Sequence, residues 1–254
     1  MAKISGLGQK LYVGGRDLSG DAGAIDSAGS PTNLLDVTSI DRLALERICG
    51  IRDGQISFTT FFNDATDAEH DALKGLPTAD VLTLWLMSGT RGDACAALSA
   101  KQINYDLART ADGGLTFKVD MQSAAASFLE YGVILVAKTT THTSNGSDET
   151  GFDNGSAASD GAVGFLQHFA DTSPSGTIEY DIEDSSDTTD GDDGSWGNLI
   201  AFSDVSTPWA AYTERKVVNG EVLRWQRAST NGTYTNASFA MSLRVRVSGD
   251  VDAA

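Results

Sequence analysis

The chain has 254 residues, 41% of them hydrophobic, with a formal net charge of −17 and an isoelectric point near 4.3. This hydrophobic content is normal for a folded protein, and the length is enough for one large core or two of moderate size. The negative charge argues against a protein that binds phosphate backbones, because such binding requires clustered Lys and Arg.

The N-terminal residues, MAKISGLGQKLYVGG, lack the apolar run of a secretory signal. No segment approaches the roughly 20 apolar residues that a membrane-spanning helix requires. We therefore expect a soluble chain that is made in the cytoplasm and has no membrane partner. Cys49 and Cys95 are the only cysteines, and two free thiols are favoured over a disulfide.

Residues 1–137 read as strands with one short helix. A strand and a Gly-rich turn are expected at 10–15 (KLYVGG), and the Gly-, Asp-, Ser- and Ala-rich segment 17–34 is expected to be an extended arm or loop. Residues 55–62 alternate as a strand. Its two faces are apolar (Ile56, Phe58, Phe62) and polar (Gln55, Ser57, Thr59).

A helix is expected in TDAEHDALKG, residues 66–75. Thr66 and Glu69 have the spacing of a capping box, and Gly75 and Pro77 end the pattern. Further strands are expected in four segments of this half: 80–87, with both faces buried, 96–110, 115–121 and 131–137.

Residues 138–162 are rich in Ser, Thr, Gly, Asn and Asp, which is typical of a linker. Short strands separated by turns then predict a C-terminal β-sandwich, jelly-roll or immunoglobulin-like, over residues 163–248, followed by a tail at 249–254. The chain is therefore predicted to be mainly β, with two domains.

The acidic turn DSSDTTDGDDG offers hard oxygen ligands that suit calcium. The EF-hand spacing fails, however, so a solvated hairpin tip is favoured over a metal site. The candidate ligands are Asp184, Asp187, Asp190, Asp192 and Asp193.

No catalytic constellation is present in the sequence. His70, His142 and His168 share no catalytic or metal-ligand spacing, and there is no nucleophile elbow, P-loop or dinucleotide-binding glycine motif. We therefore expect no enzymatic activity and no cofactor.

Three tryptophans of the second half, Trp196, Trp209 and Trp225, allow two interpretations. Exposed rings would stack on sugars, whereas buried rings would fill a sandwich core, and the core role is favoured. The strands that carry Trp196 and Trp225 resemble, over short matches, those of carbohydrate-binding sandwiches. Host-surface glycans therefore remain possible partners of this half.

Three segments of the first half carry a more specific resemblance: LDVTSIDRLALERICGIRDGQISFTTFFNDA, HDALKGLPTADVLTLWL and AALSAKQINYDLARTADGGLTFKVDMQS. Together with the start, MAKISGLGQKLYVGGRDLSGDAG, they resemble the major tail (tail tube) proteins of long-tailed, siphovirus-type phages that infect actinobacteria. The resemblance covers residues 1–137 and extends more loosely over the second half.

The resemblance implies a virion protein that forms hexameric rings, which stack into a tube through which DNA passes. The expected partners are further copies of the chain and other tail proteins, with only transient, non-specific passage of DNA. In that family a β-sandwich with a short helix contributes strands to a barrel around the lumen, and an N-terminal arm joins rings.

Two sets of residues suit this role. The polar face of strand 55–62, with Gln55, Ser57 and Thr59, would suit a wet lumen that does not attract DNA. The charged segment before it would contact neighbouring subunits or rings. Its candidate contact residues are Asp41, Arg42, Glu46, Arg47, Arg52 and Asp53.

Two other functions remain open. One is a head decoration or other virion surface protein, and the other is a carbohydrate-binding adhesin that uses the C-terminal sandwich.

Overall fold

The computed structural model describes residues 6–124, 127–138, 142, 146–147, 151–169, 175–186, 195–208 and 210–248. Strands dominate these residues, and α1 (Glu69–Leu73) is the helix found among them. The strands are β1 (Lys10–Val13), β2 (Arg16–Asp17), β3 (Ala22–Gly29), β4 (Thr32–Asp36), β5 (Arg47–Arg52), β6 (Gln55–Phe61), β7 (Val81–Leu86), β8 (Ala94–Gln102), β9 (Asp106–Arg109), β10 (Leu115–Ser123), β11 (Glu130–Val136), β12 (Gly146–Ser147), β13 (Phe152–Asp153), β14 (Ala162–Phe169), β15 (Ser175–Ser185), β16 (Gly197–Ala201), β17 (Val205–Ser206), β18 (Tyr212–Val218), β19 (Trp225–Thr235) and β20 (Ser238–Val245).

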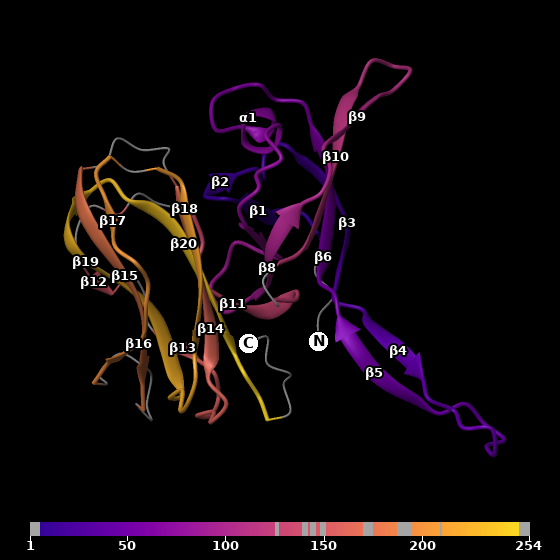
Figure 1. The fold of residues 1–254 in the computed structure, drawn as a ribbon. Coiled ribbons are helices and arrows are strands. Elements are labelled where there is room, and N and C mark those ends of the chain that lie inside the picture. Colours follow the sequence, from indigo (N-terminus) through magenta and orange to yellow (C-terminus); the bar gives the residue numbers. More distant parts are fainter. Residues whose placement is uncertain are drawn as a thin grey trace.

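A 12-stranded sheet runs through both halves of the chain. Its main path is β18-β14-β20-β11-β8-β10-β6-β3, and β1, β2, β7 and β9 branch from it. The pairing of β11 with both β8 and β20 joins the first half to the second (Figure 1). The prediction of a mainly β fold with one short helix is confirmed.

A second sheet, β12-β19-β15-β16, covers one face of the strands from the second half. The core between the two sheets contains Tyr180, Phe239 and Met241, all fully buried. Burying one such side chain contributes about 1.5–3 kcal/mol, so this core stabilises the sandwich substantially. In Figure 1 this sandwich lies on the left, away from β3–β6.

Strands β14 and β20 are buried on both faces. Their second face packs in another core with β1 and β7, where Tyr12, Leu84 and Phe165 meet. The polar residues here are buried as well: Ser242 is fully buried, and Arg246, just after β20, is only 4% exposed. The first half supplies a third core, which includes Phe58, Leu98 and Val119.

The expected capping box of the helix is wrong. The N-cap position is Ala68, which makes no side-chain capping bond. Instead the amide of Glu69 donates to Asp21 at 3.2 Å, and the buried Glu69 carboxylate accepts from Thr60 at 2.9 Å. Tertiary contacts therefore replace the local cap, and the helix begins three residues later than the pattern predicted. It still ends just before Gly75.

Residues 17–34, expected to be an extended arm or loop, contain the extended strand β3 and the start of β4. The small residues of β3 pair along β6 with two register shifts, and β3 ends the main path of the large sheet. Parts of the expected linker 138–162 likewise pair with the second half, through β12, β13 and a bridge from Ala158 to Val222. The two-domain division itself stays a prediction.

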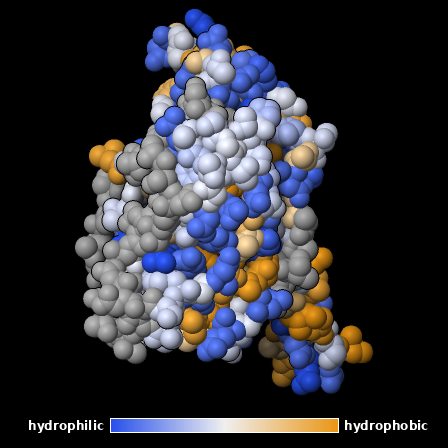
Figure 2. Space-filling model, turned by 90° about the vertical axis from the view of Figure 1, so that its left-hand side faces the viewer, coloured by the Kyte–Doolittle hydropathy of each residue, from blue (hydrophilic) through white to orange (hydrophobic). Residues whose placement is uncertain are grey.

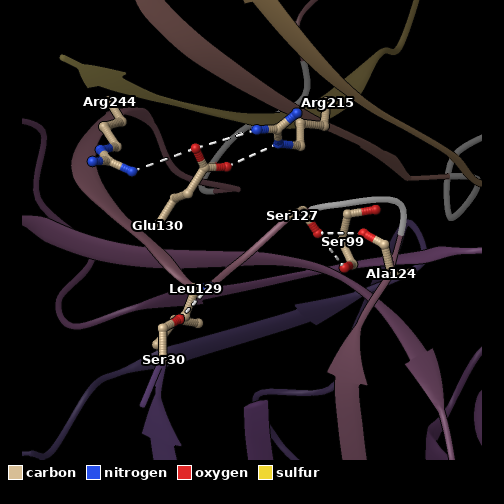
Figure 3. A network of polar contacts seen from close by, with 8 residues as sticks. All are labelled: Ser30, Ser99, Ala124, Ser127, Leu129, Glu130, Arg215 and Arg244. Carbon is tan, nitrogen blue, oxygen red and sulfur yellow. Dashed lines mark hydrogen bonds and ion pairs between the residues drawn. The ribbon is translucent and has the colours of Figure 1, made fainter. Parts of the chain in front are cut away.

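A buried ion cluster links β11 to two strands of the second half (Figure 3). The carboxylate of Glu130, 2% exposed, accepts two bonds from Arg215, at 2.8 and 3.3 Å. Arg244 lies 3.5 Å from the same carboxylate. The strands on either side are therefore held together by charge as well as by packing. Among the described residues, no helix has the length and apolarity to cross a membrane.

Candidate functional site

The segment before β6 forms a hairpin that stands apart from both large sheets. Strands β4 and β5 pair only with each other, in register Leu34 to Cys49 and Asp36 to Arg47, and a ten-residue loop, 37–46, joins them. Figure 1 shows this hairpin extending from the body at the end opposite the tip of β9. We call β4, β5 and their loop the assembly hairpin.

The root of the assembly hairpin is anchored to the segment before β11. The amide of Leu129 donates to Ser30 at 2.7 Å (Figure 3), and Gly54 is packed against the backbone of residues 128–129. A Cβ on Gly54 would lie 2.6 Å from the nitrogen of Leu129, so only glycine fits there. This close contact fixes the direction in which the hairpin leaves the body.

The loop of the hairpin has its own hydrogen bonds. Asp36 accepts from the amide of Thr38 at 2.9 Å, and the Thr38 hydroxyl accepts from the amide of Glu46 at 2.7 Å. The hydroxyl and the amide of Thr38 both bond to the Asp36 carboxylate and hold its pKa below the usual value. The loop is therefore ordered at its base, although no described residue outside the hairpin covers it.

Large apolar side chains are exposed along the whole assembly hairpin. They occupy both faces of the ribbon and the loop, and Ile40 and Leu43 are as exposed as in an open chain, at 107%. The hairpin surface in Figure 2, at the lower right, carries this apolar character. The eight residues are Leu34, Leu35, Val37, Ile40, Leu43, Leu45, Ile48 and Ile51.

Such a hairpin is marginal on its own in water. Two-stranded ribbons need a third strand or a packing surface for stability, and exposed apolar patches mark interaction sites. Here the two faces and the tip all lack cover within the described part of the chain. The arrangement therefore fits a segment that packs against another protein surface.

The charged residues expected at this interface lie at two levels of the hairpin. Near the tip, Arg42 and Glu46 form an exposed ion pair at 3.9 Å, and Asp41 accepts from Ser39. Exposed pairs of this kind contribute little to stability, so they are free to exchange partners. Arg47 is exposed and stands across the ribbon from Asp36.

Near the root, two of the expected contact residues are engaged within the chain. Arg52 stacks over the ring of Phe128, with its guanidinium 5.3 Å from the ring centre. Asp53 accepts from Ser123 at 2.8 Å and also from Gln122. The sequence analysis emphasised these charges and missed the exposed apolar side chains. Their one signal in the sequence is that they recur with neither a helical nor a strand period.

The polar face expected on β6 is present. Ile56, Phe58 and Thr60 are buried, whereas Gln55, Ser57 and Thr59 point to the other side, together with the exposed Phe61 at the strand end. Phe62, expected on the apolar face, lies beyond the strand and is 41% exposed. In the neighbouring strand β10 their register partners are Gln122, Asp120 and Lys118.

Carboxylates dominate this polar face. Thr59 donates to Asp26 at 2.8 Å, Ser57 donates to Asp120, and Asp106 stands beside Lys118 across β9 and β10. Lys118 lies 3.8 Å from Asp120, so the one lysine in this group is already paired. The face is therefore hydrophilic with a negative excess, which disfavours contact with a polyanion.

The other candidate residues lie elsewhere. Asp187, Asp190, Asp192 and Asp193 are outside the described residues, whereas Asp184 is buried and accepts from the Leu223 amide at 2.8 Å. Burial raises the pKa of Asp184. Within the described residues, no group of three or more His, Cys, Asp or Glu side chains is arranged to hold a metal.

The histidines and tryptophans are engaged in packing. His168 is buried with its Nδ1 2.6 Å from the Tyr180 hydroxyl, and His70 lies 3.0 Å from that of Tyr105. The Trp225 ring is 8% exposed, and Trp196 lies under the guanidinium of Arg227 at 4.1 Å. Trp209 is outside the described residues.

No family model and no curated protein matches the chain. Solved structures give distant matches. The tail of an empty gene transfer agent particle with C6 symmetry is 19% identical over 51% of this chain and 98% of its own, with a TM-score of 0.39. The Dit protein of phage SPP1 is 8% identical over 96% of this chain and 100% of its own, with a TM-score of 0.34. A chain of the phage p2 baseplate in its activated conformation with strontium is 9% identical over 94% of this chain and 98% of its own, with a TM-score of 0.32.

Proposed function

We propose that the chain is a structural subunit of a phage tail tube, in which hexameric rings stack around a lumen for DNA. The observation that carries the proposal is the assembly hairpin, because eight exposed apolar side chains on a projecting ribbon require a partner surface. The resemblance of residues 1–137 to tail tube proteins suggests which assembly this is, namely stacked rings. The protein would be made in the host cytoplasm and act in the virion, with other tail proteins at the ends of the tube.

In this assembly the hairpin packs on a neighbouring copy of the chain. Its tip charges, Asp41, Arg42, Glu46 and Arg47, would select the register of that contact, since charged rims contribute more to specificity than to affinity. Strand β3 ends the path of the large sheet, and none of the described strands pairs with its outer edge. A ring gives such an edge a partner.

The polar face of β6 and β10 would line the lumen. Its hydroxyls, amides and carboxylates keep the surface wet, and its negative excess prevents DNA from adhering. In this role the face acts only as a passive surface and catalyses no reaction.

Negative-stain microscopy of the purified chain at high concentration tests the assembly. Rings or tubes of uniform bore are expected. Attachment to empty capsids without rings would instead favour a head decoration protein, and a chain that remains monomeric under all conditions would contradict the proposal.

The two cysteines provide a measurement on the unmodified protein. Cys49 is exposed on the hairpin, whereas Cys95 is buried and its burial raises the pKa of the thiol to about 12. In the dilute monomer, a chromogenic disulfide reagent should therefore titrate Cys49 alone. After assembly we expect the reaction of Cys49 to slow by roughly tenfold or more, because the thiol must be exposed before it reacts.

Cys95 is the internal control of that titration. It should react only after unfolding in denaturant, in monomer and assembly alike. An unchanged rate for Cys49 in well-formed rings would show that the hairpin is not part of the contact.

A lysine on the polar face tests the lumen. Thr59→Lys should leave assembly intact but make the tubes retain short double-stranded DNA at low salt, with release as salt increases, because retention would be electrostatic. Ser206→Lys, on the second sheet, adds the same charge to an exposed site and is the matched control. If both variants retain DNA equally, or if neither retains it, the assignment of β6 to the lumen is wrong.

A further inference from the structure

A pocket opens at the root of the assembly hairpin, with a volume of about 340 Å³. We call it the root pocket. It lies where β5 leaves the body and where β11 and β20 meet the segment before β11. The lining residues are Ser30, Arg52, Phe128, Leu129, Tyr131 and Arg244.

Two guanidinium groups are held in this pocket by one ring. The guanidinium carbons of Arg52 and Arg244 each lie 5.3 Å from the centre of the Phe128 ring. Phe128 is only 8% exposed, so it is a fixed platform for both. Arg52 is exposed at the mouth, whereas the side chain of Arg244 is 14% exposed. Cation–π contacts of this kind position the charges without neutralising them.

The local charge is positive in a strongly negative chain. Glu130 is the carboxylate beneath the pocket, and Arg215 already binds both of its oxygens. Arg244 makes a longer contact of 3.5 Å with one of them. Arg215 and Arg244 thus share one buried carboxylate, and Arg52 adds a third positive charge at the mouth, where its Nε donates to Thr32 at 3.3 Å. A largely desolvated guanidinium favours a planar carboxylate partner, because it donates two parallel hydrogen bonds.

We propose that the root pocket receives a carboxylate side chain, Asp or Glu, from a second copy of the chain. This inference rests on the proposed function, since it requires copies to assemble. The pocket has a positive excess, whereas the chain carries 35 acidic and 18 basic residues, so a second copy is rich in the complementary group. The pocket also adjoins the assembly hairpin, which makes the two parts of one continuous interface.

The lining has the composition of an energetically important contact. Arg and Tyr are enriched at the centres of interfaces, and Tyr131, 55% exposed, is available to close over an incoming side chain. The hairpin would then provide apolar contact area, and the root pocket would fix the angle and register of the neighbouring copy.

Zero-length cross-linking identifies the occupant. Arg52→Lys places an amine at the mouth of the pocket, and a carbodiimide joins it to any carboxylate in contact, with loss of water. Assemblies are prepared from equal amounts of isotopically labelled and unlabelled chains. We expect the introduced lysine to be joined to one specific Asp or Glu. After proteolysis, mass spectrometry should find cross-linked peptide pairs in which one peptide is labelled and the other is unlabelled. Cross-links within single chains alone would overturn the proposal.

Assembly measurements give the second arm of the test. Arg52→Gln should raise the concentration needed for half-assembly by roughly tenfold, the change that loss of one interfacial charge pair produces. Arg109→Gln, an exposed arginine on β9 at the opposite end of the body, is the matched control and should have no effect. If the unsubstituted chain assembles and either Arg52 variant fails to show its expected result, the root pocket proposal fails alone. If the unsubstituted chain never assembles, the proposed function fails with it.

Discussion

Replacement of both Ile40 and Leu43 by Ser is expected to abolish ring and tube formation while the single chain stays folded. Both side chains are 107% exposed, so they contribute no packing to the monomer. Burial of two such side chains in a neighbour contributes about 3–6 kcal/mol per contact, and its loss weakens each contact by at least a hundredfold. Sedimentation velocity over a concentration series, with microscopy of the same samples, measures this loss.

The control for the hairpin tip removes two exposed apolar side chains elsewhere. Leu76 and Val247 are 45% and 64% exposed and lie outside the hairpin. A Leu76→Ser, Val247→Ser double variant should assemble as the unsubstituted chain does. Thermal unfolding should be unchanged for the tip variant, since surface substitutions usually alter the free energy of unfolding by about 0.5 kcal/mol or less. Normal tubes from the tip variant would contradict the role of the hairpin.

Glu130→Gln is expected to lower the free energy of unfolding by about 3–5 kcal/mol, a large part of the stability of an ordinary domain. The amide keeps the shape of the side chain but removes the negative charge that Arg215 and Arg244 share. Their side chains are 16% and 14% exposed, so water replaces the carboxylate poorly. Urea unfolding followed by circular dichroism, with the slope checked for constancy, measures the change.

Glu46→Gln is the control for the ion cluster. Its ion pair with Arg42 is 3.9 Å long and more than half exposed on both sides, so no measurable loss is expected. A similar, small change in both variants would mean that the cluster adds little to the joint between the halves. Replacing Glu130, Arg215 and Arg244 together by Met should restore most of the stability, because no buried charge is then left unpaired.

The strands were predictable where their own residues alternate. On β15, Ile178, Tyr180 and Ile182 alternate with acidic residues and are fully buried, although Asp181 between them is buried as well. Strand β7 is buried on both faces, as its continuous apolar run predicted. The local pattern was insufficient where a distant partner decided the structure. Asp21, far away in sequence, caps the helix, and β6 recruits the Gly- and Ala-rich segment of β3 as an edge strand.

The candidate site was predictable in position but not in character. The charges of residues 41–53 marked the segment, yet the apolar side chains between them have no period that would reveal a common exposed surface. Only the hairpin register shows that Leu35 and Ile48 share one face of the ribbon and Leu34 and Cys49 the other. The root pocket was invisible in the sequence, because Arg52, Phe128 and Arg244 come from three distant segments.

The sequence by itself determined the mainly β fold class, most of the strands and the division of β6 into an apolar and a polar face. These features depend on the order of neighbouring residues, which hydrophobic periodicity records directly. Only the tertiary structure decided that one sheet joins the two halves, that Glu130 neutralises charges from two other strands, and that the described part of the chain leaves the assembly hairpin uncovered. Which strands pair, and which surfaces are covered, depends on which distant segments meet. The packing of the whole chain decides this, and no local sequence pattern does.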